Sequence, residues 1–173
     1  MKKCLFIWSL SLFFVACNGQ VPSSRAHCQN ADFDKKVANM LNFSVKTMSP
    51  NDVKRQSDIL ILDARERSEY DVSHLPNAVF VGYNNFEKKI LDSVAKDRPI
   101  VVYCSIGYRS EKIGDKLQKQ GFSKVFNLYG SIFEWVNQGN PVVDKDGQPT
   151  KKVHTYNKNW SRWVEEGKAE KIW

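Results

Sequence analysis

The chain has 173 residues, of which 42% are hydrophobic and 26% are charged, and its formal net charge is +7. This length and composition fit one globular domain with extensions. The mildly basic charge favours anionic small molecules or an anionic membrane surface. There is no basic run with interleaved aromatic residues, so no nucleic-acid partner is expected. The four cysteines form no CxxC pair and the three histidines are far apart, so neither a metal site nor a cofactor is expected.

Residues 1–16, MKKCLFIWSLSLFFVA, consist of a short basic start and an apolar run that ends in a small residue. This pattern is typical of a secretory signal peptide, and the run is too short for a comfortable membrane span. The end of the segment, with Cys17, resembles the lipobox of bacterial lipoproteins, although Phe14 stands where that family usually has Leu. The resemblance implies lipidation at Cys17 and anchoring to a membrane of the bacterial cell envelope, in the periplasm or on the outer face. Ordinary secretion with cleavage near Cys17 is the alternative.

Residues 17–30 are polar and contain Gly and Pro, which predicts a flexible tether between the lipid and the domain. Cys28 lies in this tether. Three interpretations of Cys28 stay open: an incidental free thiol, a thiol that exchanges with Cys104, and a disulfide partner in an oxidising compartment.

Hydrophobic spacing predicts alternating helices and strands in residues 31–143. In chain order they are a helix over 32–42, a strand over 43–48, a helix that Ser49 caps, strands over 58–63 and 79–81, a helix from Asn84, a strand over 100–103, a helix from Ser110 to Gly121, a strand over 124–128 and a helix over 132–137. This alternation predicts an α/β domain with an N-terminal helix and a mainly parallel central sheet covered by helices on both faces.

Residues 144–173 are predicted to form a C-terminal extension. It opens with the turn-rich segment DKDGQPT. Trp160, Trp163 and Val164 then recur at spacings of three and four, which predicts a short helix that packs onto the domain. We interpret its tryptophans as residues that cover the core rather than as a ligand cage.

The stretch from residue 99 to 110, PIVVYCSIGYRS, joins a predicted buried strand to a predicted helix start at Ser110. Cys104 is therefore expected at the carboxyl end of a strand, beside the amino end of a helix. Open α/β sheets place ligand sites there, and backbone N–H groups of such a turn bind anions. With Arg109 close by, we expect Cys104 to have a lowered pKa and to be nucleophilic.

Four motifs within residues 45–143 resemble a single rhodanese, or sulfurtransferase, domain. In chain order they are LDAR with Glu69-Tyr70, HLPNA at residues 74–78, YCSIGYRS at 103–110, and LYGS at 128–131 with Trp135 and the GNPV segment at 139–142. The sequence departs from the family pattern where Ser73 and Asn77 replace Gly, and where Ser131 replaces the second Gly of a pair. Ser105 stands where many members carry Arg, which leaves the sulfur donor open.

The resemblance implies transfer of sulfane sulfur, through a persulfide on Cys104, from thiosulfate or a persulfide to a thiol or cyanide. The expected partners are small sulfur-containing anions, thiols and a thiol redox protein. The expected anion cradle consists of Ser105, Ile106, Gly107, Tyr108, Arg109 and Ser110. In this cradle Gly107 permits a tight bend, Tyr108 borders the pocket and Arg109 orients an anionic donor or stabilises the departing charge. Ser110 either donates its hydroxyl to the loop or caps the helix.

Asp63 and Arg65 are predicted to form an ion pair that braces the active loop, with a substrate contact from Arg65 as the alternative. Glu69 is expected to pair with an Arg or a backbone amide. His74 is expected to be a hydrogen-bonded loop residue rather than a general base.

The loop has the spacing C-x4-R, one residue shorter than the C-x5-R of the cysteine phosphatases that share this fold. A shorter loop makes a smaller cradle, which suits sulfur better than phosphate or arsenate. The main alternative function is a non-catalytic binding or redox-sensing module with the same fold. A cysteine phosphatase or an arsenate reductase-like enzyme comes after it.

Overall fold

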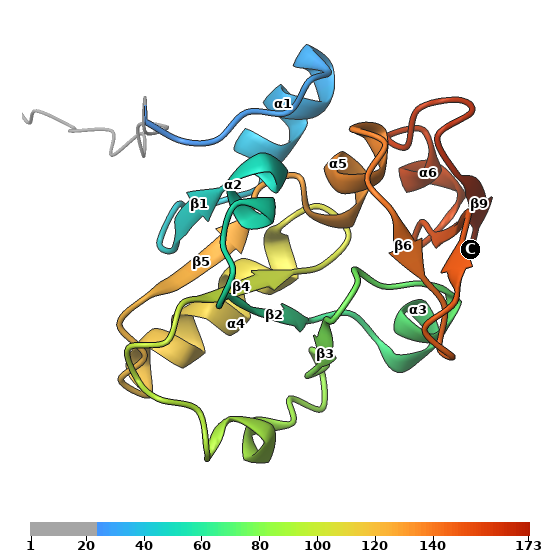
Figure 1. The fold of residues 1–173 in the computed structure, drawn as a ribbon. Coiled ribbons are helices and arrows are strands. Elements are labelled where there is room, and N and C mark those ends of the chain that lie inside the picture. The colour runs from blue at the N-terminus through green and yellow to red at the C-terminus, as the bar shows by residue number, and fades with distance from the viewer. Residues whose placement is uncertain (1–23) are drawn as a thin grey trace, which may run out of the picture.

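The computed structural model describes residues 24–173, and its central element is a five-stranded sheet (Figure 1). The strands lie in the order β1-β5-β4-β2-β3, and every neighbouring pair is parallel. Their bounds are β1 Lys46–Met48, β2 Leu60–Asp63, β3 Val79–Phe80, β4 Ile100–Tyr103 and β5 Val125–Leu128. The parallel pairing confirms the predicted α/β class.

Helices pack on both faces of this sheet. They are α1 Ala31–Ala38, α2 Pro50–Lys54, the 3-10 helix η1 Lys88–Leu91, α4 Tyr108–Lys119 and α5 Ser131–Asn137. Another helix, α3 Arg67–Val72, follows β2. The fully buried residues of β4 alternate between two apolar cores. Val101 and Tyr103 pack with residues of α1, α2 and α5, whereas Ile100 and Val102 pack with residues of α4 and η1. This alternation is what a strand covered on both faces requires.

The connections that follow β2 and β4 leave the sheet in opposite directions. From β2 the chain passes through α3 to β3 at one edge, and from β4 it passes through α4 to β5 on the other side. Open α/β sheets place their ligand sites at such a point, outside the carboxyl ends of the strands. The cysteine loop follows β4 at this position.

Several predicted element boundaries are wrong, and the structure shows a clear reason for two of them. The strand predicted from residue 43 begins only at Lys46, because Phe43 has a φ of 55°, which is incompatible with an extended backbone. The helix predicted from Asn84 is reduced to the single turn of η1. Asn84 donates its side-chain amide to Glu66 at 2.8 Å instead of capping a helix.

The flexible tether predicted for residues 17–30 does not extend to residue 30. Arg25 donates hydrogen bonds to Asp34 Oδ1 at 2.8 Å and to the Tyr129 hydroxyl at 2.6 Å. Cys28 is only 8% exposed and packs in the core as a free cysteine. Burial, with the neighbouring carboxylates, raises the pKa of the Cys28 thiol well above its usual range, which disfavours a thiolate that exchanges with Cys104.

The predicted signal peptide, residues 1–16, and the predicted lipidation site Cys17 lie outside the described residues. Within residues 24–173, no helix has the length and apolar character needed to cross a bilayer.

The C-terminal extension adds two small sheets and a short helix to the domain. Its elements are β7 Pro149–Thr150, which pairs antiparallel with β6 Val142–Val143 at the end of the domain, then β8 Lys152–His154, α6 Lys158–Ser161 and β9 Glu170–Ile172, which pairs parallel with β8. Asn137 of α5 joins the extension to the domain, since its amide donates to Trp163 O and accepts from Glu165 N, each at 2.9 Å. The Trp163 ring stacks on Phe33 of α1 with a centroid distance of 5.5 Å.

Candidate active site

Cys104 directly follows β4, and the loop after it folds back over its sulfur. The backbone N–H of Gly107 donates to Cys104 Sγ at 3.2 Å, and the Ser110 hydroxyl lies 3.6 Å from the same atom. Gly107 has a φ of 125°, which favours glycine, and is the N-cap of α4. The helix therefore begins at Tyr108, two residues before the predicted start, and Ser110 lies inside its first turn.

The surroundings of Cys104 favour a thiolate. Burial by itself opposes ionisation of this thiol, which is 1% exposed. The charge of Arg109 and the hydrogen bonds from Ser110 and Gly107 outweigh burial and lower the pKa of Cys104 below its usual value. A buried thiolate stabilised in this way is a nucleophile.

Two further side chains hold the loop in shape. Asn127 of β5 is fully buried and donates to Gly107 O at 3.0 Å, while Ser110 donates to Asn127 Oδ1 at 2.7 Å. Ser131 accepts a hydrogen bond from Cys104 N at 3.1 Å and donates to Leu128 O at 3.1 Å. The sequence reasoning missed the role of Asn127, although an amide inside an otherwise apolar strand was the available signal. Of the two roles open for Ser110, the structure shows the hydroxyl donating within the loop.

Arg109 is paired with Glu69 instead of facing a donor freely. Its Nη1 and Nη2 lie 2.6 Å and 2.8 Å from the Glu69 carboxylate, and Nη2 also donates to Ser105 Oγ at 2.9 Å. Ser105 in turn donates to Glu69 Oε1 at 3.3 Å. Glu69 thus meets the expectation of an Arg partner. The Glu69 carboxylate accepts one hydrogen bond from each terminal nitrogen of Arg109, and the role of Arg109 in orienting an anionic donor or stabilising the departing charge stays a prediction.

Asp63 and Arg65 form a fully buried ion pair beneath the loop, with Arg65 Nη2 2.6 Å from Asp63 Oδ2. Arg65 also donates to Ser73 O at 2.6 Å. The Tyr103 hydroxyl donates to Asp63 and accepts from Leu75 N. These bonds fix the end of β4 immediately before the cysteine. Arg65 is absent from the cavity wall, which favours the bracing role over a substrate contact.

His74 also has the predicted structural setting. Its Nδ1 lies 3.1 Å from Tyr70 O, and its ring stacks on the Tyr70 ring at a centroid distance of 3.8 Å. Within residues 24–173 no group of three or more His, Cys, Asp or Glu side chains is placed to hold a metal ion.

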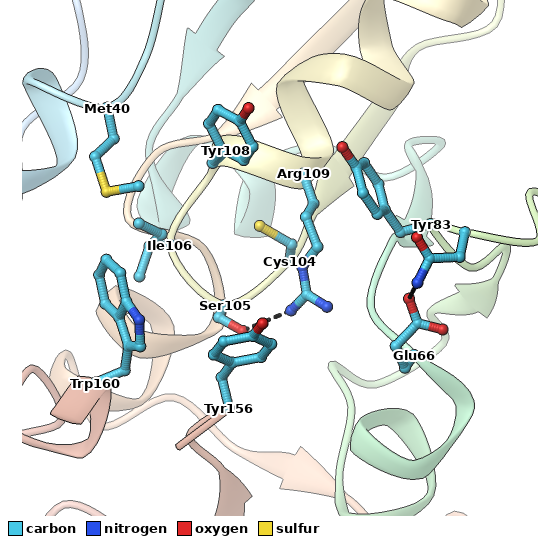
Figure 2. A pocket seen from close by; sticks show the side chains of 11 residues that line it. Met40, Glu66, Tyr83, Cys104, Ser105, Ile106, Tyr108, Arg109, Tyr156 and Trp160 are labelled. Carbon is cyan, nitrogen blue, oxygen red and sulfur yellow. Dashed lines mark hydrogen bonds between the residues drawn. The ribbon is translucent and has the colours of Figure 1, made fainter. Parts of the chain in front are cut away.

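A cavity of about 470 Å³ opens at Cys104 (Figure 2). The loop contributes Ser105, Ile106, Tyr108 and Arg109, so four of the six predicted cradle residues line the cavity beside the cysteine. Gly107 and Ser110 lie behind them and contact the sulfur. The remaining wall comes from other segments: Met40, Glu66, Tyr83, Asn84, Tyr156 and Trp160. Trp160 packs against the core together with Trp163 and Val164, as predicted, and it also borders the cavity.

The fold and the site together define a parallel α/β domain organised around one buried cysteine whose thiol pKa is lowered by its surroundings. A family model described as the rhodanese-like domain matches residues 49–138. The chain therefore belongs to the rhodanese-like family, as the four sequence motifs predicted.

Two similar curated proteins are both named tRNA uridine(34) hydroxylase. The protein from Escherichia fergusonii is 32% identical over 120 residues, which is 64% of this chain and 33% of that protein. The protein from onion yellows phytoplasma is 40% identical over 86 residues, which is 47% of this chain and 28% of that protein. The chain thus spans about a third of the length of these relatives or less.

Solved structures show the same fold. The rhodanese-like domain of an Anabaena protein superposes with a TM-score of 0.53 at 24% identity, covering 57% of this chain and 78% of that one. The thiosulfate sulfurtransferase of Pseudomonas aeruginosa superposes with a TM-score of 0.52 at 18% identity, covering 68% of this chain and 23% of that one.

Proposed function

We propose that the protein is a rhodanese-type sulfurtransferase, which moves sulfane sulfur from thiosulfate or a persulfide to a thiol or cyanide. The observation that carries this proposal is the Cys104 sulfur, held 3.2 Å from Gly107 N at the edge of an open cavity with its pKa lowered. Covalent sulfur transfer needs a cysteine that ionises readily to a thiolate. After the transfer, Cys104 carries a persulfide anion, which the N–H groups of the loop stabilise.

The reaction divides into two displacements. In the first, the Cys104 thiolate attacks the outer sulfur of the donor, the donor's S–S bond breaks, and its electron pair leaves with sulfite or a thiolate. In the second, the acceptor attacks the terminal sulfur of the Cys104 persulfide, and the cysteine regains its thiolate. Each step moves a neutral sulfur atom, so the overall reaction needs no external oxidant or reductant.

The geometry favours turnover over the alternatives. A non-catalytic binding module does not require a cysteine whose thiolate is stabilised by three separate groups. A phosphatase or arsenate reductase needs a cradle for a tetrahedral anion, whereas this loop is short and its Arg109 is occupied by Glu69. Hydroxylation of tRNA, the activity in the relatives' names, is not extended to this chain, because the match covers a third of those proteins or less.

We also propose that the domain acts in the bacterial cell envelope, tethered to a membrane by lipid on Cys17. The support is the sequence pattern of residues 1–17. Expression with a radiolabelled fatty acid tests the tether: label should enter the wild-type chain, and Cys17→Ser should lack it. Equal labelling of both chains would contradict lipidation at this residue.

Mass spectrometry of the purified protein tests the activity. After incubation with thiosulfate, or with a low-molecular-weight persulfide, the peptide that contains Cys104 should gain one sulfur atom, and cyanide should remove it as thiocyanate. Cys104→Ser should abolish the gain. Cys28→Ser is the matched control and should retain it, because Cys28 packs in the core rather than at the cavity. If no donor of either class adds sulfur to Cys104, the proposed function is wrong.

A further inference from the structure

Part of the cavity wall comes from beyond the segment that matches the family. The family match ends at residue 138, whereas Tyr156 and Trp160 belong to the C-terminal extension. Figure 2 shows both rings beside the cysteine loop, Tyr156 near Ser105 and Arg109, and Trp160 near Ile106. The extension therefore adds two aromatic side chains to the site that the rhodanese-like core alone does not contain.

Several contacts hold these rings in place. The Asn157 side chain caps α6 by accepting a hydrogen bond from Trp160 N at 3.2 Å. Lys36 Nζ lies 5.3 Å from the centroid of the Trp160 ring, and the Arg109 guanidinium carbon lies 5.4 Å from that of Tyr156. Upstream of both rings, Thr155 is fully buried and bonds through its N–H and its hydroxyl to Ile172 O. The wall is thus anchored to α1, to the active loop and to β9.

The charges around the cavity do not favour a dianion. Among residues 24–173, Arg109 is the only basic residue in the cavity wall, and it is paired with the buried carboxylate of Glu69. Glu66, the other charged residue of the wall, is acidic. A donor with two negative charges must approach the Cys104 thiolate beside an arginine whose charge already stabilises that thiolate and is paired with Glu69. The repulsion between donor and thiolate rises as water is excluded.

The apolar surfaces of the wall suit a flat organic group. Met40, Tyr83 and Tyr108 complete the cavity with the two rings of the extension. Aromatic side chains gain from contact with another ring beyond the burial of area alone, and methionine adapts to irregular apolar shapes. Tyr108 and Tyr156 are 41% and 55% exposed, so a bound molecule would remove substantial aromatic surface from water.

We propose, on the basis of the proposed sulfurtransferase function, that the sulfur donor is an organic sulfane-sulfur compound with an aromatic or similarly apolar body and at most one negative charge. Tyr156 and Trp160 bind that body and determine specificity against thiosulfate. With an organic persulfide, the Cys104 thiolate attacks the outer sulfur, the donor's S–S bond breaks, and the organic group leaves as a thiolate. The Cys104 persulfide keeps the proton that the donor's outer sulfur carried.

Two thiosulfonate salts provide a matched pair of probes. Benzenethiosulfonate and methanethiosulfonate carry the same reacting sulfur and the same single charge, and each leaves as a sulfinate after its S–S bond breaks. They differ in the apolar body and, to a smaller extent, in the basicity of the sulfinate that leaves. Thiosulfate is the dianionic comparison, and saturating cyanide is the acceptor, so that thiocyanate release gives kcat/KM for each donor.

We expect kcat/KM for benzenethiosulfonate to exceed that for methanethiosulfonate by about tenfold or more, and thiosulfate to be the poorest of the three. A tenfold ratio corresponds to about 1.4 kcal/mol of binding to the ring. Trp160→Ala and Tyr156→Ala should each reduce the ratio of benzenethiosulfonate to methanethiosulfonate by several fold, whereas Trp160→Phe should restore much of it. Trp173→Ala is the control, since this tryptophan is 58% exposed and lies outside the cavity.

The outcomes separate the two proposals. If no donor produces a persulfide on Cys104, the sulfurtransferase function itself fails. If persulfide forms but the ratio is near one, or thiosulfate is the best donor, the function stands and the proposed substrate class is overturned. A high ratio that neither alanine variant changes overturns the role of the extension. Circular dichroism checks the fold of Trp160→Ala, and the exposed Tyr156 gives an independent variant if that protein does not fold.

Discussion

Replacing Glu69 by Gln separates the structural role of the Glu69–Arg109 pair from the chemistry of the cysteine. Glu69 is 2% exposed, and its carboxylate receives two charge-assisted hydrogen bonds from Arg109, at 2.6 Å and 2.8 Å. The Arg109 side chain is itself only 14% exposed. Gln keeps the size and one acceptor of the side chain but removes the charge, which leaves the guanidinium without a counter-ion.

The expected cost follows from this burial. Removing one partner of a buried ion pair typically costs about 3–5 kcal/mol, because the remaining charge is left uncompensated. The amide oxygen of Gln retains one hydrogen bond to Arg109, which returns about 1 kcal/mol. We therefore expect Glu69→Gln to lower the free energy of unfolding by about 2–4 kcal/mol at neutral pH.

The pH dependence provides a second readout. Burial alone would raise the pKa of Glu69, but the hydrogen bonds and charge of Arg109 outweigh it and hold this pKa below its usual value. A lowered carboxyl pKa stabilises the fold above the unfolded-state value of about 4.3. That stability is lost as the pH falls through the folded-state pKa. The difference between wild type and Glu69→Gln should therefore be largest at neutral pH and should shrink in acid below about pH 4.

Urea unfolding of both proteins, followed by circular dichroism from neutral to acidic pH, measures these differences. Glu166→Gln is the control, because Glu166 is 97% exposed and lies 3.4 Å from Lys171 in a surface ion pair. Such pairs contribute about 0–1 kcal/mol. A loss for Glu69→Gln as small as that of the control, or one that does not change with pH, would refute the argument that burial makes this pair important for stability.

Three further results are expected. The rate of Cys104 alkylation by iodoacetamide should rise with pH at a midpoint below the usual thiol pKa. Ser110→Ala removes a hydroxyl near Cys104 Sγ and should move this midpoint to higher pH by about half a unit. An unchanged midpoint would contradict the role of the Ser110 hydroxyl in stabilising the thiolate. Gly130→Ala should destabilise the fold by about 1–3 kcal/mol more than Gly121→Ala in the same urea assay, and equal losses would contradict this. Both glycines have positive φ, but only at Gly130 would a new Cβ meet a neighbour, at 2.5 Å. Glu69→Gln should raise the ratio of kcat/KM for thiosulfate to kcat/KM for methanethiosulfonate, because it removes a negative charge beside the cavity. A fall in this ratio would contradict the argument that charge at the cavity disfavours a dianionic donor.

Much of the site could be predicted because its parts are close together in the sequence. The buried strand before Cys104, the tight bend at Gly107 and the proximity of Arg109 all lie within one short segment. Asp63 and Arg65 are two residues apart, so their pairing was predictable as well. In these segments chain connectivity alone limits where the side chains can lie.

The partners of that segment were harder to identify. Glu69 was expected to pair with an Arg, but 40 positions separate it from Arg109, and only the adjacency of β2 and β4 makes this Arg the partner. Asn127 reaches the loop because β5 pairs with β4. Hydrophobic periodicity within one segment cannot predict either contact, because both contacts depend on the order of the strands in the sheet.

The sequence by itself determined the α/β class, the position of Cys104 after a buried strand and the length of the loop that follows, because these depend on hydrophobic periodicity and on residues joined by a few bonds. Only the tertiary structure decided that Glu69 neutralises Arg109 and that Tyr156 and Trp160 border the cavity. The position of the extension depends on contacts with α1 and α5, such as those of Asn137, which are distant in the chain and are made only when the core has packed. The spacing of Trp160, Trp163 and Val164 indicated that the extension packs on the domain, but the face on which it packs is a property of the assembled fold.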